Sequence, residues 1–276
     1  MAFYMKNEKP PRLLLAGLLL AFLLPGCGTP PPAQNRLPAE PLDQHLKEFM
    51  DTSPRDGSLV FLGVAGIRFR RQESIDLALK DAARRLAIFR DVEGEFYTWA
   101  ARGGRLLDYR AETRSSLSYN LNYEHYIAAF GFNENYDIFE SENAIFVRVR
   151  YPGSLSLNYR PYFPRRNGRP SWIDSPPDKI GQYSAGVGFA GQRHAHRDTI
   201  TASYENAVFA IILNKYAVAF GETLAYRGPG LLDSASIIRE GVRARGRLNG
   251  FYVLETWTDP NDRSVWTLAI ARGTAF

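Results

Sequence analysis

The chain contains a single cysteine among its 276 residues, and this scarcity excludes several classes of protein at once. Cys27 cannot form an internal disulfide, and alone it cannot build a zinc site of the multi-cysteine kind. The four histidines show no Ser/His/Asp or Cys/His arrangement that spacing supports, and no isolated pair of carboxylates is suited to acid–base catalysis. We therefore expect no catalytic residue, no metal site, no cofactor and no enzymatic activity.

The chain also lacks an apolar run long enough to span a bilayer comfortably. Residues 13–24 (LLLAGLLLAFLL) have the length of a signal-peptide core, and the basic segment at residues 6–12 precedes them. The run ends in Leu-Pro-Gly-Cys at residues 24–27, which resembles the bacterial lipobox. This resemblance implies that the signal peptide is cleaved after Gly26 and that Cys27 becomes acylated.

Lipidation at Cys27 would fix the location of the mature protein. One acyl chain holds a protein to a bilayer only marginally, whereas several chains on one residue form a durable anchor. Gly28 follows the cysteine, where the lipoprotein pattern carries aspartate for retention at the inner membrane. We therefore expect an outer-membrane protein anchored by lipid on the periplasmic side, with surface exposure left open. Residues 28–41 are rich in proline and read as a tether.

Basic residues are only slightly in excess. The net charge is +5 with a pI near 9.3, but the expected signal peptide holds three basic residues and one acidic residue, so the remainder carries +3. This balance indicates no particular polyanionic partner, and we expect no binding of nucleic acid.

The sequence after the tether predicts two copies of one module. Residues 63–68 (GVAGIR) align with residues 188–193 (GFAGQR) at an offset of 125, and the register continues without gaps. In each copy a short apolar run predicts a strand, and Ser74 or Thr199 is placed to cap a following helix. The expected fold is therefore α+β, with two tandem related modules, each a small antiparallel sheet packed against an alanine-rich helix.

Other patterns predict the remaining elements. The alternation in residues 117–123 predicts a half-buried strand, and each copy closes with a predicted hairpin, at 136–151 and 251–271. Residues 231–248 are ambiguous, and the prolines of residues 161–178 favour an irregular connector. The expected organisation is a signal peptide (1–26), a lipidated cysteine and tether (27–56), a first module (57–152), a connector (153–179) and a second module (180–276).

The second copy resembles a known family. Pro-Ser-Trp-Ile at residues 170–173, the small-residue strand at 185–190 (AGVGFA) and a helix carrying Ala202, Ala207 and Ala210 are similar to the LPP-twenty lipoprotein family. The resemblance implies a non-enzymatic envelope protein that acts as a structural or assembly subunit, with a flagellar-motor-associated ring or scaffold as the favoured role. Its partners would be other proteins or further copies of the chain. The alternative is a periplasmic glycan- or peptide-binding lipoprotein in export or cell-wall maintenance.

Three further patterns were weighed as sites. Residues 186–191 match G-x-G-x-x-G, but the expected helix cap at Thr199 lies too far away for dinucleotide binding. His194 and His196 lack a nearby third ligand, so a solvated loop is the better interpretation than a metal site. Aromatic and basic residues supply the candidate interaction surface, for contact with protein or glycan or with lipid phosphates. Its members are Tyr119, Tyr123, Tyr126, Arg68 and Arg70.

Overall fold

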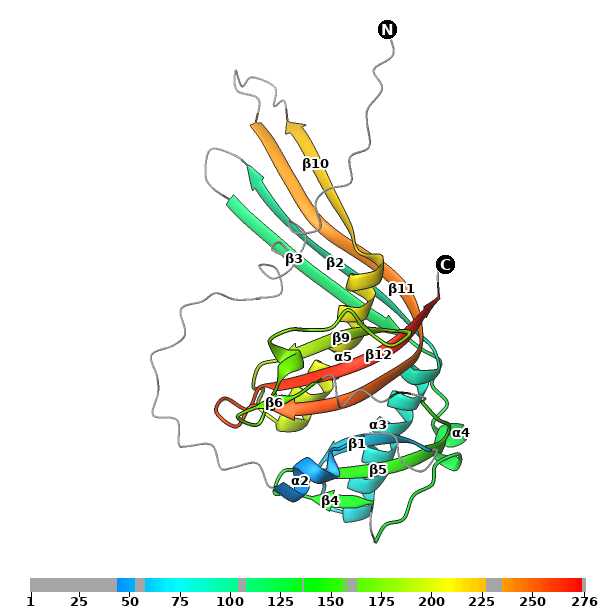
Figure 1. The fold of residues 1–276 in the computed structure, drawn as a ribbon. Helices are drawn as coiled ribbons and strands as arrows, with labels where there is room; N and C mark the ends of the chain where they lie inside the picture. Colours follow the sequence, from blue (N-terminus) through cyan, green and yellow to red (C-terminus); the bar gives the residue numbers. More distant parts are fainter. Residues whose placement is uncertain are drawn as a thin grey trace. The chain divides into compact units, whose positions relative to one another are not determined.

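The structure is a computed structural model, and it shows an α+β fold with mostly antiparallel sheets (Figure 1). The described residues are 44–52, 58–103, 108–135, 137–155, 157, 163–226 and 235–274. The expected signal peptide, Gly26, Cys27 and the tether at 28–41 lie outside the described residues. Within the described part, no helix combines the length and the apolar character needed to cross a membrane.

A three-stranded antiparallel sheet is formed by the first half of the chain. Its order is β1 (Ser58–Gly66), β5 (Ala144–Pro152) and β4 (Ile138–Glu140), and helix α3 (Arg71–Arg90) packs against it. The short helix α2 (Gln44–Phe49) precedes this unit and contributes Leu46 and Phe49 to a neighbouring apolar cluster. The predictions of a strand before the helix and of a hairpin near residue 140 are confirmed.

A seven-stranded antiparallel sheet takes strands from both halves of the chain. Helix α5 (His196–Tyr216) packs against β9, β11 and β12 of this sheet. The second predicted hairpin is confirmed as β11–β12, and residues 235–248, the described part of the ambiguous segment 231–248, form the first part of one long strand. The strands are β2 (Val92–Gly103), β3 (Asp108–Ser118), β8 (Lys179–Ile180), β9 (Tyr183–Ala190), β10 (Val218–Tyr226), β11 (Ala235–Thr258) and β12 (Val265–Thr274).

Equivalent glycines let each long helix approach its strand closely. A Cβ atom on Gly63 would lie 2.0 Å from the carbonyl oxygen of Ala78 on α3, and one on Gly188 would lie 2.0 Å from that of Ser203 on α5. Both pairs of positions differ by the offset of 125 that the sequence repeat predicts. The two strand–helix contacts are therefore built in the same way, while the expected duplication into tandem modules stays a prediction.

Both long helices begin four residues before the position that the sequence indicates, with N-cap positions at Arg70 and Ala195 in place of Ser74 and Thr199. Helix α3 starts at Arg71 and α5 at His196, and neither has a side-chain cap. The hydroxyls of Ser74 and Thr199 instead accept hydrogen bonds from the backbone N–H groups of Arg68 (2.8 Å) and Arg193 (3.0 Å). The prediction that these hydroxyls cap the helices is wrong, because they close the preceding loop.

The strand predicted over residues 117–123 is also wrong. Strand β3 ends at Ser118, and helix α4 (Tyr123–Ala128) begins where the strand was expected to finish. The cause is Asn122, whose side chain accepts a hydrogen bond from the backbone N–H of His125 at 3.1 Å and so caps the new helix.

The two halves are joined through both the sheet and the core. Strands β2 and β3 belong to the expected first module, yet β2 pairs with β11 over its whole length. The hydroxyl of Tyr252 on β11 accepts a hydrogen bond from Val60 N (2.9 Å) and donates to Thr52 O (2.6 Å). Residues 39–276 accordingly form one compact unit, and the boundaries of separate modules remain a prediction.

The predicted connector is partly irregular but contributes to the core. It contains two short strands, β6 (Arg165–Arg166) and β7 (Arg169–Pro170), and the 3₁₀ turn Ser171–Ile173. Trp172 is fully buried, and its Nε1 donates to a carboxylate oxygen of Glu255 at 3.0 Å. The segment therefore anchors the sheet at β11 and does more than link two units.

Candidate functional site

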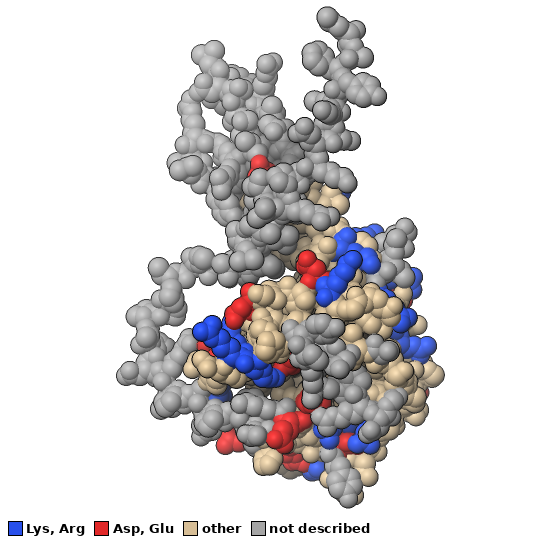
Figure 2. Space-filling view, in the orientation of Figure 1, with Lys and Arg blue, Asp and Glu red and all other residues tan. Residues whose placement is uncertain are grey.

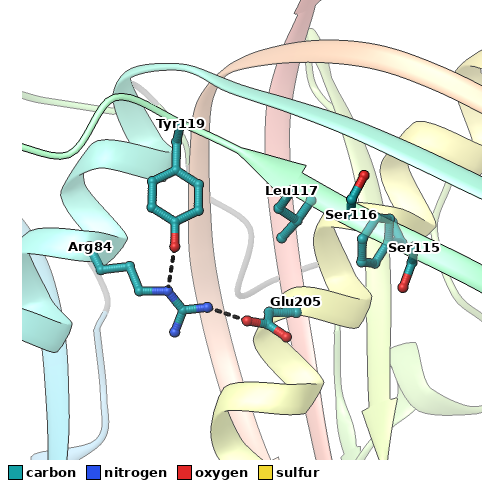
Figure 3. A pocket seen from close by; sticks show the side chains of 7 residues that line it. Arg84, Ser115, Ser116, Leu117, Tyr119 and Glu205 are labelled. Carbon is teal, nitrogen blue, oxygen red and sulfur yellow. Dashed lines mark hydrogen bonds and ion pairs between the residues drawn. The ribbon is translucent and has the colours of Figure 1, made fainter.

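A cleft lies where α3, α5 and the end of β3 meet. Figure 3 shows Arg84 of α3 between Tyr119, which follows β3, and Glu205 of α5. The Nε of Arg84 donates to the Tyr119 hydroxyl at 2.8 Å, and its guanidinium pairs with Glu205. Asp81, one turn earlier on α3, lies 3.7 Å from the same guanidinium. One side chain thus links three elements that are distant in the sequence.

The neighbours of Arg84 favour its charged form. Burial by itself lowers the pKa of this guanidinium, but the Tyr119 hydroxyl and the charges of Asp81 and Glu205 more than offset it, so its pKa is raised. The cleft has a volume of about 190 Å³, below the roughly 300–1,000 Å³ of typical small-molecule sites. Because Arg84 is held on three partners, it acts as a structural bridge.

Arg85, the next residue, is buried at the interface between the same two helices. Its Nε lies 3.1 Å from a carboxylate oxygen of Asp81, and its guanidinium lies over the ring of Tyr204 at 4.8 Å. Burial raises the pKa of Tyr204, although the charges of both arginines oppose this. The sequence analysis missed both arginines, although two charged residues interrupting an apolar helix stripe were a visible signal.

The three predicted surface tyrosines are mostly used for packing. Tyr126 is buried, and its hydroxyl donates to Asn120 O at 3.2 Å. Tyr119 is held against Arg84, as described above. Tyr123 is 39% exposed, with the Lys80 ammonium 6.0 Å from the centre of its ring. Of the three, Tyr123 offers the most surface for a partner.

The two predicted arginines lie elsewhere, in the loop between β1 and α3. Arg68 and Arg70 are exposed, and their side chains form no ion pair with any residue that the structure describes. At about 1.5 Å per residue along α3, Arg70 is roughly 20 Å from Arg84 and from the tyrosine beside it. The structure therefore separates the predicted surface into two regions.

The loop also presents apolar side chains that the sequence analysis missed. Phe69 is fully exposed at 103%, and Ile67 is 48% exposed, so they alternate with the two arginines. Arg197 of α5 is next to this loop, because a Cβ atom on Gly66 would lie 1.7 Å from its Nη1. We call Ile67, Arg68, Phe69, Arg70 and Arg197 the loop patch. Its combination of apolar and basic side chains is the chemistry of contact with an anionic lipid surface.

On the face drawn in Figure 2, neither sign of charge dominates a wide area of the described residues. Figure 2 shows basic and acidic side chains intermingled on the visible face. Several exposed arginines are paired with carboxylates, such as Arg247 with Asp91 and Arg245 with Glu93. This pattern is unlike the broad basic face with which proteins bind nucleic acid.

In the second half of the chain, two motif glycines pack against helix α5, His194 is exposed in the loop before that helix, and His196 is its first residue. Gly186 and Gly188, two of the three glycines of the G-x-G-x-x-G motif, face α5 and serve the contact between strand and helix, whereas a Cβ atom on Gly191 would have no neighbour within 4 Å. Burial lowers the pKa of His196, and the charge of Arg263 lowers it further. Among the described residues, no group of three or more histidine, cysteine, aspartate or glutamate side chains is placed to hold a metal ion.

Comparison with known proteins adds no relative. No protein-family model, no curated protein and no solved structure matches the chain. The resemblance to the LPP-twenty lipoproteins therefore stays a prediction.

Proposed function

We propose that the protein is a non-enzymatic envelope lipoprotein, anchored by acylated Cys27 in the outer membrane, and that it serves as a structural or assembly subunit. The observation that carries this proposal is the lone cysteine directly after a basic segment and an apolar run of signal-peptide length. The specific role that the family resemblance favours is a subunit of a ring or scaffold associated with the flagellar motor.

The loop patch supports this proposal from the folded part of the chain. Phe69 and Ile67 are exposed to water at an energetic cost, and inserting them among lipid headgroups would remove this cost. The neighbouring arginines would meet lipid phosphates. A body tied to a bilayer by its N-terminal cysteine would thus have a second, weaker contact with the same surface.

The anchor is tested on the full chain expressed in a Gram-negative host. Intact-mass analysis should show a chain that starts at Cys27 and carries acyl groups, recovered in the outer-membrane fraction. The Cys27→Ser variant should lack the added mass and leave that fraction. An unmodified thiol, or a natural product that still starts at Met1, would refute the proposal.

The loop patch is tested separately on a chain that starts at residue 28, so that neither the apolar run of residues 13–24 nor a lipid on Cys27 masks a weak contact, and the compact unit of residues 39–276 is kept whole. Sedimentation with phosphatidylglycerol vesicles measures binding of the folded body. Burying a phenylalanine side chain is worth roughly 1.5–3 kcal/mol, so Phe69→Ser should weaken binding about tenfold or more. Tyr123→Ser, at an exposed aromatic residue outside the patch, is the matched control. Equal binding by the two variants would exclude membrane contact through this loop.

A further inference from the structure

Two hairpins form a four-stranded ribbon with two open edges. The strand order is β3-β2-β11-β10, and the three pairings run without a register shift over residues 108–118, 92–103, 237–248 and 218–226 (Figure 1). Among the described residues, β3 and β10 each pair with a strand on one side only. Each edge therefore presents a row of backbone N–H and C=O groups that no described strand satisfies.

Both edges lack three of the devices that protect exposed strands, namely short length, proline and a bulge, although each carries charged residues, such as Glu112 and Arg114 on β3 and Glu222 on β10. Natural edges are kept short or are interrupted by proline or a bulge, because a long regular edge recruits another strand. Strand β3 has 11 residues and β10 has 9, and neither contains proline. The charges of Arg114 and Glu112 on β3 pair with each other, and the exposed residues around them are small: Ala111, Thr113, Ser115, Ser116 and Ser118.

The ribbon is also held in shape before any partner arrives. Tyr97 of β2 and Phe220 of β10 stack across β11, with ring centres 5.5 Å apart and planes inclined by 8°. Gly241 lies between them, and a Cβ atom there would be 2.7 Å from the Phe220 ring. A template that is ordered in advance loses less conformational entropy when a strand is added.

The direction of the strands allows a second copy of the chain to be the partner. All three pairings are antiparallel, so with four strands β3 and β10 run in opposite directions. If two copies lie side by side in the same orientation, β3 of one copy meets β10 of the next as an antiparallel pair. We propose that copies of this chain associate head to tail through the β3 and β10 edges and thereby continue one antiparallel sheet from subunit to subunit.

This arrangement deepens the proposed function, since it identifies the partner of the assembly subunit as a second copy of the same chain. A head-to-tail contact uses two different surfaces, so it produces a ring where the rotation closes and a filament where it does not. The pairing itself does not require the lipid anchor. Its failure can therefore be distinguished from failure of the anchor.

The test uses the full chain with Cys27→Ser, so that introduced cysteines are the only thiols. Ala111→Cys lies on β3 and Ala219→Cys on β10, and both alanines are exposed. Three strand spacings, roughly 14 Å in total, separate the two edges within one copy, so a bismaleimide that spans about 8 Å links only different copies. The double variant should give a ladder of covalent dimers, trimers and larger species. Equimolar mixing of the two single variants should give dimers alone.

Four outcomes would overturn the proposal. A double variant that remains monomeric at tens of micromolar would exclude the contact, and self-linking of the Ala111→Cys variant would indicate pairing of β3 with β3. A ladder equally strong in the control pair Glu124→Cys/Glu142→Cys, on exposed residues outside the ribbon, would indicate random collision. As an independent measurement, sedimentation velocity should show the double variant Ala111→Lys/Ala219→Lys as a monomer, whereas oligomers unaffected by these charges would also refute the pairing.

Discussion

The close approach of the two long helices to their strands can be tested by adding one methyl group. In Gly63→Ala the new Cβ would lie 2.0 Å from Ala78 O and 2.9 Å from Ala82 N, and in Gly188→Ala it would lie 2.0 Å from Ser203 O and 2.3 Å from Ala207 N. All four neighbours are backbone atoms, so no side chain can rotate away. Each helix must move by more than 1 Å to restore ordinary contacts of about 3.4 Å.

The expected loss of stability follows from the packing contacts between each helix and its strand. A gap of 0.5–1 Å forfeits roughly a quarter to a half of the dispersion energy across the contact, and overpacked cores lose typically 1–3 kcal/mol. Alanine restricts the unfolded chain more than glycine does, which returns about 0.4–1 kcal/mol. Because the clash involves the fully buried Ala78 and Ala82 on α3 and Ser203 and Ala207 on α5, we expect each variant to lose about 2–3 kcal/mol.

Urea unfolding followed by tryptophan fluorescence measures this loss on the full chain with Cys27→Ser. Gly191→Ala is the matched control, since a Cβ atom there has no neighbour within 4 Å. The control should be at least as stable as the parent. If the free energy of unfolding of Gly63→Ala or Gly188→Ala differed from that of the control by less than about 0.5 kcal/mol, the claim of tight packing at that strand would be refuted.

Three further predictions concern single side chains and use the same unfolding assay. Arg84→Met should lower the free energy of unfolding by about 1–2 kcal/mol. This is less than the 3–5 kcal/mol expected for breaking a fully buried ion pair, because the partner Glu205 is 37% exposed. An unchanged free energy of unfolding would refute the role of Arg84 as a structural bridge. Trp172→Ala should lower the free energy of unfolding by about 3–5 kcal/mol, because Trp172 is fully buried. A smaller loss than that of Tyr123→Ala would contradict the place of Trp172 in the core. The pKa of His196 is lowered in the folded state, so stability should fall as the pH drops below the pKa of the unfolded chain, near 6.5. His196→Gln should flatten this loss between pH 7 and 5, and an unchanged slope would assign it to other groups.

The repeat in the sequence predicted local contacts better than it predicted helix boundaries. The offset of 125 correctly pairs Gly63 with Gly188, and it also pairs Ser74 with Thr199. Each hydroxyl lay close to a helix start, and its type suits a cap. A hydroxyl one turn inside the helix can equally bond to the loop before it, and the sequence does not distinguish the two geometries.

The candidate surface was only partly predictable for a related reason. The sequence showed aromatic residues alternating with polar ones around Tyr119, but the alternation ended in a helix capped by Asn122, which turned Tyr126 into the core. Phe69 was not among the candidate residues, of which this loop supplied only Arg68 and Arg70. Phe69 is fully exposed in the loop that Ser74 closes by a local hydrogen bond to Arg68 N, and this kind of contact leaves no periodic signal in the sequence.

The sharing of one sheet by both halves has its cause in β11. Residues 241–248 alternate, with Val242, Ala244 and Leu248 buried and Arg243 exposed, but the buried positions are mostly small and the pattern is weak. The strand is long enough to pair with β10 and then β12 on one side and with β2 on the other. Joining β2 to β11 also brings β3 and β10 to opposite edges of one ribbon. The feature that merges the two halves within one chain is therefore the same feature that leaves two complementary edges for the next chain.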